Sequence, residues 1–210
     1  MKKNTLLLLA EVVALLVIPM FSSSLSFVYI LLVLGIIFFS KFQRKARWSD
    51  DGFKSVEWSN VLLAAVVGVA FAAFSNYIQE PLVSKLTGEE ADLSSFGNVK
   101  GNLGAFMVLL AMGWIIGGLF EEFLFRGYLL NRINQLFSNP AWAKWTGIFV
   151  TSISFAIAHT YQGMGGMINT FIFSLVLGML YYFLNRNTWY VILVHGFFDT
   201  FGIFYIYMGW

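Results

Sequence analysis

The sequence predicts an all-α protein: a polytopic transmembrane helical bundle of about seven helices, forming one integral membrane domain over residues 1–210. Three observations carry this prediction. Hydrophobic residues make up 59% of the chain and charged residues 11%, whereas a soluble domain has about a quarter charged residues. The mean hydropathy is positive, at +0.75. The apolar residues also occur in long runs with short polar connections, so we expect no soluble catalytic module outside the bilayer.

The same composition excludes several classes of function. The chain contains no cysteine, which removes a disulfide framework, a thiol nucleophile and a cysteine-ligated metal. The net charge of +2 gives no reason to expect a nucleic-acid partner, because the basic residues follow membrane topology instead. The expected partners are the lipid bilayer and whatever a polar site inside the bundle binds.

Seven segments are apolar over most of the roughly 20 residues that a membrane-spanning helix needs. The first begins like a signal peptide, but its apolar run is long and leads almost directly into the second, so we interpret it as a retained helix. The polar connection from Gln79 to Asn102 should contain a short interfacial helix. The seven predicted helices are Thr5 to Phe21, Leu25 to Phe39, Val61 to Ile78, Leu103 to Leu130, Thr146 to Thr160, Met167 to Leu184 and Tyr190 to Met208.

The positions of the lysines and arginines predict the orientation. If the N-terminus is cytoplasmic, only Lys85 and Lys100 of the thirteen basic residues fall on the outer side. The reverse orientation would invert this bias and break the positive-inside rule. We therefore predict a cytoplasmic N-terminus and an extracytoplasmic C-terminus.

The segment Glu121-Glu122-Phe-Leu-Phe-Arg126 places three ionisable residues inside the fourth predicted helix. Charge at membrane depth is unfavourable and is usually kept for function. Glu122 and Arg126 are four residues apart on one helix face, which favours an ion pair. Glu121 is rotated away without a basic partner, so desolvation makes it the better candidate for a general base. The alternative is a buried ion pair that only locks this helix to its neighbours.

The only two histidines also lie in apolar segments. His159 ends the fifth predicted helix, and His195 and Asp199 share a face of the seventh. Asp199 could orient the His195 imidazole, or both could bind a metal as an i, i+4 pair. A hydrogen bond from His195 to a backbone carbonyl in a packed bundle is the structural alternative. Glu11, alone in the first helix, is assigned no role.

Three motifs carry a family resemblance. EEFLFR resembles the EExxxR motif, Phe155 to His159 resembles FxxxH, and His195 to Asp199 resembles HxxxN/D. In this order, over a core of about residues 103–200, they are similar to the CPBP family, the CAAX-processing and bacteriocin-processing intramembrane endopeptidases also called the Abi family. The resemblance implies an intramembrane polar cavity that opens toward the cytoplasm. It also implies hydrolysis of a peptide bond in a membrane-associated protein or peptide, and with the compactness of the chain it suggests a plasma or bacterial inner membrane.

Residue by residue, the resemblance makes Glu121 the base that activates water, assisted by His159. His195 and the residue at position 199 would stabilise the oxyanion or hold the water, while Glu122 and Arg126 support them.

One departure from the family pattern leaves the mechanism open. An asparagine at position 199 could donate to an oxyanion, but an ionised Asp199 cannot. In a metal-free mechanism without a cofactor, Asp199 is protonated or orients His195. In the alternative, zinc bound by His159, His195 and a carboxylate, Asp199 or Glu121, lowers the pKa of its water to about 7. The resemblance favours the metal-free form.

Two further classes of protein remain compatible with these residues. A bacteriocin-immunity factor or regulatory scaffold could use the polar cluster only for stability. A proton-coupled carrier could use membrane carboxylates and histidines, although the sequence lacks the usual repeat. Glycines at 113, 117 and 118 and again at 163, 165 and 166 predict close helix packing, with a hinge as the alternative.

Overall fold

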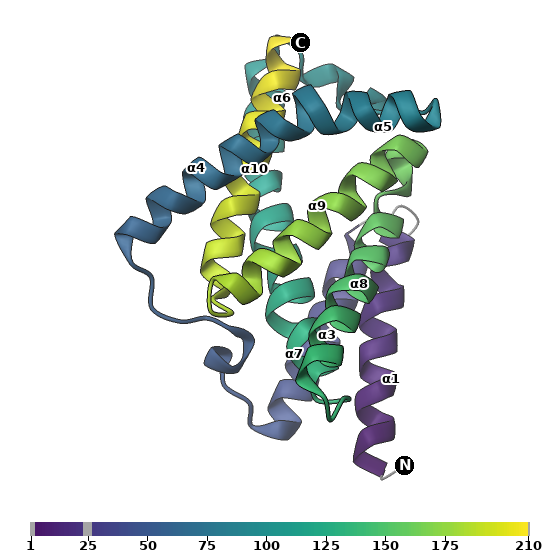
Figure 1. Ribbon diagram of the computed structural model, residues 1–210, viewed down its shortest axis with the longest axis vertical. Coiled ribbons are helices and arrows are strands. Elements are labelled where there is room, and N and C mark those ends of the chain that lie inside the picture. The colour runs from purple at the N-terminus through teal and green to yellow at the C-terminus, as the bar shows by residue number, and fades with distance from the viewer. Residues whose placement is uncertain (1–2, 23–26, 210) are drawn as a thin grey trace.

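The computed structural model describes residues 3–22 and 27–209, and these residues form helices and no strand. Most helices run along or obliquely to the longest axis (Figure 1). The helical elements are α1 (Lys3–Val17), η1 (Ile18–Phe21), α3 (Val28–Arg44), η2 (Trp48–Asp51), α4 (Trp58–Phe74), η3 (Ser75–Gln79), α5 (Glu80–Thr87), η4 (Ser94–Val99), α6 (Leu103–Met112), η5 (Gly113–Glu121), η6 (Phe123–Leu129), α7 (Leu130–Asn134), α8 (Pro140–Ala158), η7 (Thr160–Gln162), α9 (Gly163–Phe183) and α10 (Thr188–Met208).

The all-α, polytopic prediction is confirmed. Within the described residues, four helices are long and apolar enough to cross a membrane: Trp58–Thr87, Leu103–Asn134, Thr160–Phe183 and Thr188–Met208. Thr5–Phe21 is a shorter apolar helix. The other two predicted helices correspond to α3 and α8, and Leu25, the predicted start of one, lies outside the described residues. The start of α1 and the end of α10 lie at opposite ends of the molecule (Figure 1).

A short helix, α5, is present in the predicted connection, but it does not stand alone. The π-helical turn η3 joins it to α4, so one helix runs from Trp58 to Thr87. It ends at Gly88, whose positive φ of 75° closes the helix. The polar connection therefore begins later than predicted, and residues 88–102 form what we call the roof segment.

The helix that carries the two glutamates departs from the regular α-helix expected for it. From Gly113 to Leu129 it is π-helical except at Glu122, so the rotation of 100° per residue does not apply there. Its glycines lie against α10: a Cβ added to Gly117 would lie 2.6 Å from Asp199 Oδ2, and one added to Gly118 would lie 3.3 Å from the Ile192 carbonyl oxygen. The close-packing interpretation of these glycines is confirmed.

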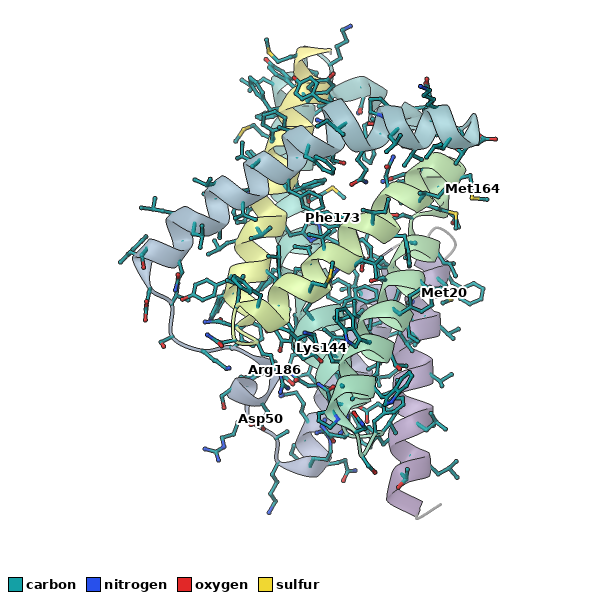
Figure 2. The ribbon with its side chains drawn as sticks, in the orientation of Figure 1. Met20, Asp50, Lys144, Met164, Phe173 and Arg186 are labelled. Atoms are coloured by element: carbon teal, nitrogen blue, oxygen red, sulfur yellow. The ribbon has the colours of Figure 1, made fainter. Side chains whose placement is uncertain are left out.

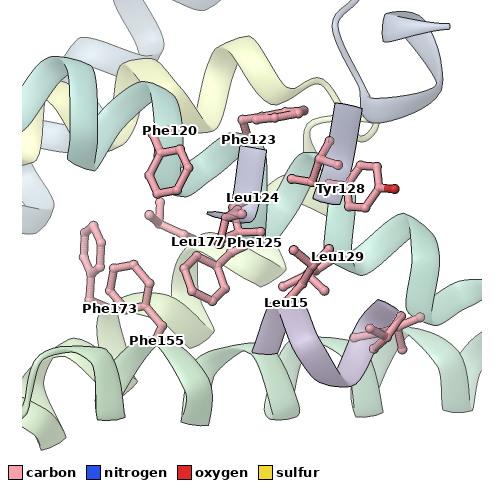
Figure 3. Packing of buried hydrophobic residues seen from close by; sticks show 14 of the residues in the cluster. Leu15, Phe120, Phe123, Leu124, Phe125, Tyr128, Leu129, Phe155, Phe173 and Leu177 are labelled. Atoms are coloured by element: carbon pink, nitrogen blue, oxygen red, sulfur yellow. The ribbon is translucent and has the colours of Figure 1, made fainter. Parts of the chain in front are cut away.

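The core lies at one end of this helix. Every residue from 122 to 133 is buried, whereas no residue from 103 to 117 is. Leu124, Tyr128 and Leu129 pack with Leu15 of α1 and Leu177 of α9 (Figure 3). Because lipid is as apolar as these side chains, close packing rather than exclusion of water holds such helices together.

The connection between α3 and α4 covers the end of this core. Lys41 and Asp51 form a buried ion pair. The Thr188 amide donates to the Gly52 carbonyl oxygen over 2.9 Å, and the Thr188 hydroxyl donates to that of Asp51 over 2.6 Å. Burial raises the pKa of the Asp51 carboxyl, while the Lys41 ammonium opposes that shift. This connection is therefore fixed to the start of α10.

The roof segment lies at the other end and is attached on two sides. The Asp92 amide donates to the Gln162 carbonyl oxygen over 2.8 Å, and the Gly101 amide donates to that of Tyr207 over 2.9 Å. A Cβ on Gly165 would lie 2.6 Å from the carbonyl carbon of Glu90, so α9 begins directly against the roof segment.

Glu11, to which the sequence assigned no role, has partners on other helices. Glu11 accepts a hydrogen bond from Arg132 Nη2 over 2.6 Å and another from the Tyr128 hydroxyl. A lone acid in an apolar run gives no hint of a partner that lies 121 positions away in the sequence. Glu11 therefore ties α1 to α7.

Candidate active site

Glu122 is the centre of a buried polar network. Its Oε1 accepts from Arg126 Nη1 over 2.7 Å and from His195 Nδ1 over 2.8 Å. Arg126 Nη2 also donates to the backbone oxygen and the hydroxyl of Ser174, over 2.9 and 2.8 Å. Glu122 is fully buried, and Arg126 is 1% exposed. The predicted ion pair between Glu122 and Arg126 is present. Through Ser174 and His195, the network around this pair links the helix that carries it to α9 and α10.

Glu121 has a different environment from its neighbour. It forms no ion pair or hydrogen bond with any other described residue. It lines two of the cavities described below, beside Phe125, Phe155 and Tyr161. The prediction that the two adjacent carboxylates differ in their partners is thus confirmed.

The two ring nitrogens of His195 face two different carboxylates. Nδ1 contacts Glu122, and Nε2 faces Asp199 Oδ1 at 3.6 Å, which is too long for a hydrogen bond. The predicted shared face of His195 and Asp199 is present, but Glu122 rather than Asp199 makes the hydrogen bond that orients the ring. The absent side chains of Gly113 and Gly117 make room for Asp199 Oδ2, because Cβ atoms there would lie 3.1 and 2.6 Å from it.

His159 follows the last residue of α8. Its Nδ1 lies 2.8 Å from the Phe155 carbonyl oxygen, and since a carbonyl only accepts, Nδ1 carries the hydrogen. In the neutral ring Nε2 is then an acceptor. The ring lies between Phe155 and Tyr161, with centroids 4.6 and 5.7 Å away. Phe173 and Phe155 also contact His195 (Figure 2 labels Phe173).

The four predicted catalytic residues meet at one cavity. A central cavity of about 300 Å³ is lined by Glu121, His159, His195 and Asp199. A second, of about 370 Å³, reaches Glu121 and His159 from η1 and α3. A third, of about 240 Å³, reaches His159, His195 and Asp199 from η3, α5 and α9. All three share His159, and the central cavity is the one of the three that all four side chains line.

The connections that line these cavities lie at one end of the molecule. They are the end of η1 with the start of α3, the roof segment, and the turn from α8 to α9. In a chain that crosses the membrane at each predicted helix, all three lie opposite the start of α1. A cytoplasmic N-terminus and a cavity that opens to the cytoplasm are therefore incompatible expectations.

The geometry gives little support to a zinc site. Among residues 3–22 and 27–209, no three histidine, aspartate or glutamate side chains are grouped so that they could hold a metal. The Nδ1 atoms of both histidines have oxygen partners, which leaves Nε2 of each ring as the atom that could contact a ligand.

Several features of the site leave little trace in the sequence. Glu122 and His195 are 73 positions apart, and their only common signal is that each interrupts an apolar run. Ser174 resembles any other small residue of a membrane helix. Glu122 Oε2 is buried and has no hydrogen-bond partner among the described residues, and such an atom in a functional site is a natural contact for water.

The comparison with family models supports the resemblance. Residues 103–201 match the family described as type II CAAX prenyl endopeptidase Rce1-like, which is consistent with the CPBP family. The match spans the segment that carries all three motifs. No curated protein and no solved structure matches the sequence.

Proposed function

We propose, from the premise that residues 103–201 belong to the Rce1-like family of type II CAAX prenyl endopeptidases, that this membrane protein is an intramembrane endopeptidase. It hydrolyses a peptide bond of a membrane-associated protein or peptide. The observation that carries the proposal is the position of Glu121: an unpaired carboxylate beside His159, in a cavity that also contains His195 and Asp199.

Water activation follows from the acceptors at the cavity. Both the Glu121 carboxylate and His159 Nε2 accept hydrogen bonds. A water between them donates one hydrogen to each and keeps a lone pair for attack on the peptide carbonyl carbon. Glu121 takes the proton as the carbon–oxygen bond forms, and later delivers it to the leaving amine when the carbon–nitrogen bond breaks. No metal or other cofactor is required.

His195 and Asp199 act on the oxyanion. When both ring nitrogens of His195 carry protons, Glu122 accepts from Nδ1 and the Nε2 hydrogen can point at the developing negative charge. A protonated Asp199 adds a second donor beside it. Glu122 and Arg126 do not contact the substrate but hold the His195 ring in place.

Glu121→Gln tests the proposal. Because the amide cannot take up a proton from water, cleavage should fall on the order of 10²–10⁴-fold, with the thermal midpoint in detergent unchanged. Cleavage is measured by mass spectrometry of new protein termini in membranes from cells that express each variant. Glu57→Gln, an exposed glutamate at the far end, is the matched control. Full cleavage by Glu121→Gln would refute the assigned role of Glu121, whereas no cleavage by the unaltered protein would favour a non-catalytic protein.

The orientation is part of the same proposal. The bias of the basic residues supports a cytoplasmic N-terminus and an extracytoplasmic C-terminus in a plasma or bacterial inner membrane. A reporter that is active only in the cytoplasm, fused after Trp210, should give no signal. A strong signal would mean an even number of spans.

A further inference from the structure

The active-site cavity lies toward the end of the molecule that carries few basic residues. Ser22, Leu93 and Phe96 line it, together with Tyr161 and Gln162 of the turn between α8 and α9. That turn lies directly beneath α5, toward the end where α10 finishes (Figure 1). Nothing from the connections α3–α4, α7–α8 or α9–α10 lines these three cavities.

The opposite route into the site is closed. Below Glu121 the helix is buried without interruption from Glu122 to Ile133. Leu124, Tyr128 and Leu129 are each 0% exposed, and Figure 3 shows them packed against α1 and α9. The α3–α4 connection, bonded to Thr188, covers that end. A further cavity of about 580 Å³ lies on that side, between Trp48, Phe53 and Phe120, and Glu121 is not among its lining residues.

The distribution of lysines and arginines between the two ends indicates that the closed end is cytoplasmic. Lys41, Arg44, Arg47 and Lys54 lie in or beside the α3–α4 connection, and Lys144, Arg186 and Arg132 lie near the other two connections of that end. The end with the opening has only Lys85 and Lys100. Short loops rich in lysine and arginine remain in the cytoplasm.

We infer that the cavity opens to the extracytoplasmic side, and that its substrate is an exported peptide or the extracytoplasmic segment of a membrane protein. This inference rests on the proposed peptidase function. It replaces the cytoplasmic opening implied by the family resemblance. A protein whose C-terminus is modified and remains in the cytoplasm could not bring that C-terminus to this site.

The absence of cysteine from the chain allows a direct test of the side. Ser95 in the roof segment and Ser49 in the α3–α4 connection are both exposed, and Met112, 38% exposed, lines the cavity. Each is replaced singly by cysteine and treated in intact cells with a membrane-impermeant maleimide. Ser95→Cys and Met112→Cys should react, and Ser49→Cys should react only after permeabilisation. The reverse pattern, or failure of Met112→Cys to react from outside, would overturn the inference.

A second measurement tests the substrate. Two pools of single-span reporter proteins carry the same randomised segment next to the membrane, one pool displaying it outside the cell and the other in the cytoplasm. Cleavage that depends on Glu121 should enrich sequences only from the outward pool. Cleavage confined to the inward pool would overturn the inference. If neither pool is cleaved while labelling is outward, the peptidase proposal fails and the side of the opening still stands.

Discussion

The two ends of the helix from Leu103 to Asn134 are built differently. From Glu122 onward every residue to 133 is buried, and Glu122, Arg126 and Arg132 contact polar groups of other helices, whereas the half before Gly117 has no buried residue. Glu121 and Glu122 stand at the boundary: Glu122 belongs to the packed half and Glu121 to the cavity. Neighbouring carboxylates thus acquire separate tasks because packing changes from one residue to the next.

The largest effect on the packed half should come from Arg126→Met. This change removes the guanidinium from the buried Glu122 carboxylate, and breaking a buried pair in this way costs about 3–5 kcal/mol. We expect a clearly lower thermal midpoint in detergent. Arg47→Met, at an exposed position, is the control. Equal midpoints for the two variants would contradict the structural role of the Glu122–Arg126 pair.

A matched pair of glycine substitutions should separate the two ends. At the packed end, Gly52 has φ +83° and a Cβ there would lie 2.5 Å from Thr188 Oγ1, so Gly52→Ala should destabilise the protein by about 1–3 kcal/mol. Activity per folded molecule should be retained, because the change is remote from Glu121. Thermal unfolding and cleavage by the folded fraction are the measurements.

At the cavity end, Gly117→Ala should lower activity as well as stability. The new methyl group would meet Asp199 Oδ2 at 2.6 Å and His195 Nε2 at 3.3 Å. Overpacking costs about 1–3 kcal/mol, but displacement of the two side chains should lower cleavage at least about tenfold, because misplacement of catalytic groups by about 1 Å can cost on the order of 100-fold. Gly35→Ala, with nothing within 4 Å of its Cβ, is the control for both glycine variants. Loss of stability without loss of activity would show that this contact does not position the site.

The smallest effect is expected for Asp199→Asn. The amide can donate to the oxyanion and takes up the same space, so activity should stay within about tenfold of the original. Chelators should not inhibit, and elemental analysis of purified protein should find no stoichiometric zinc. About one zinc per chain that is lost in His159→Ala or His195→Ala would overturn the metal-free mechanism and leave the peptidase assignment in place.

Much of the fold could be predicted because it depends on local properties. Apolar length located the helices, and the intruding charges located Glu121, His159 and His195. The Glu122–Arg126 pair followed from spacing alone. Their catalytic roles stay predictions until the variants are measured.

What could not be predicted depends on contacts between distant segments. The π-helical stretch forms where α10 approaches the glycines, and Glu122 meets His195 across 73 positions. The turn after α8, next to His159, is bonded to the roof segment through the Asp92 amide and the Gln162 carbonyl oxygen, and nothing in the apolar run before His159 indicates this contact.

The contact of Gly113 and Gly117 with Asp199 has a consequence for how related sequences vary. A side chain at position 113 or 117 would displace Asp199, the acidic residue of the HxxxN/D motif. Substitution at these two positions should therefore be rarer among relatives than at Gly35, where the surroundings are open. An alignment in which the two positions vary as freely as Gly35 would mean that other members hold this residue differently.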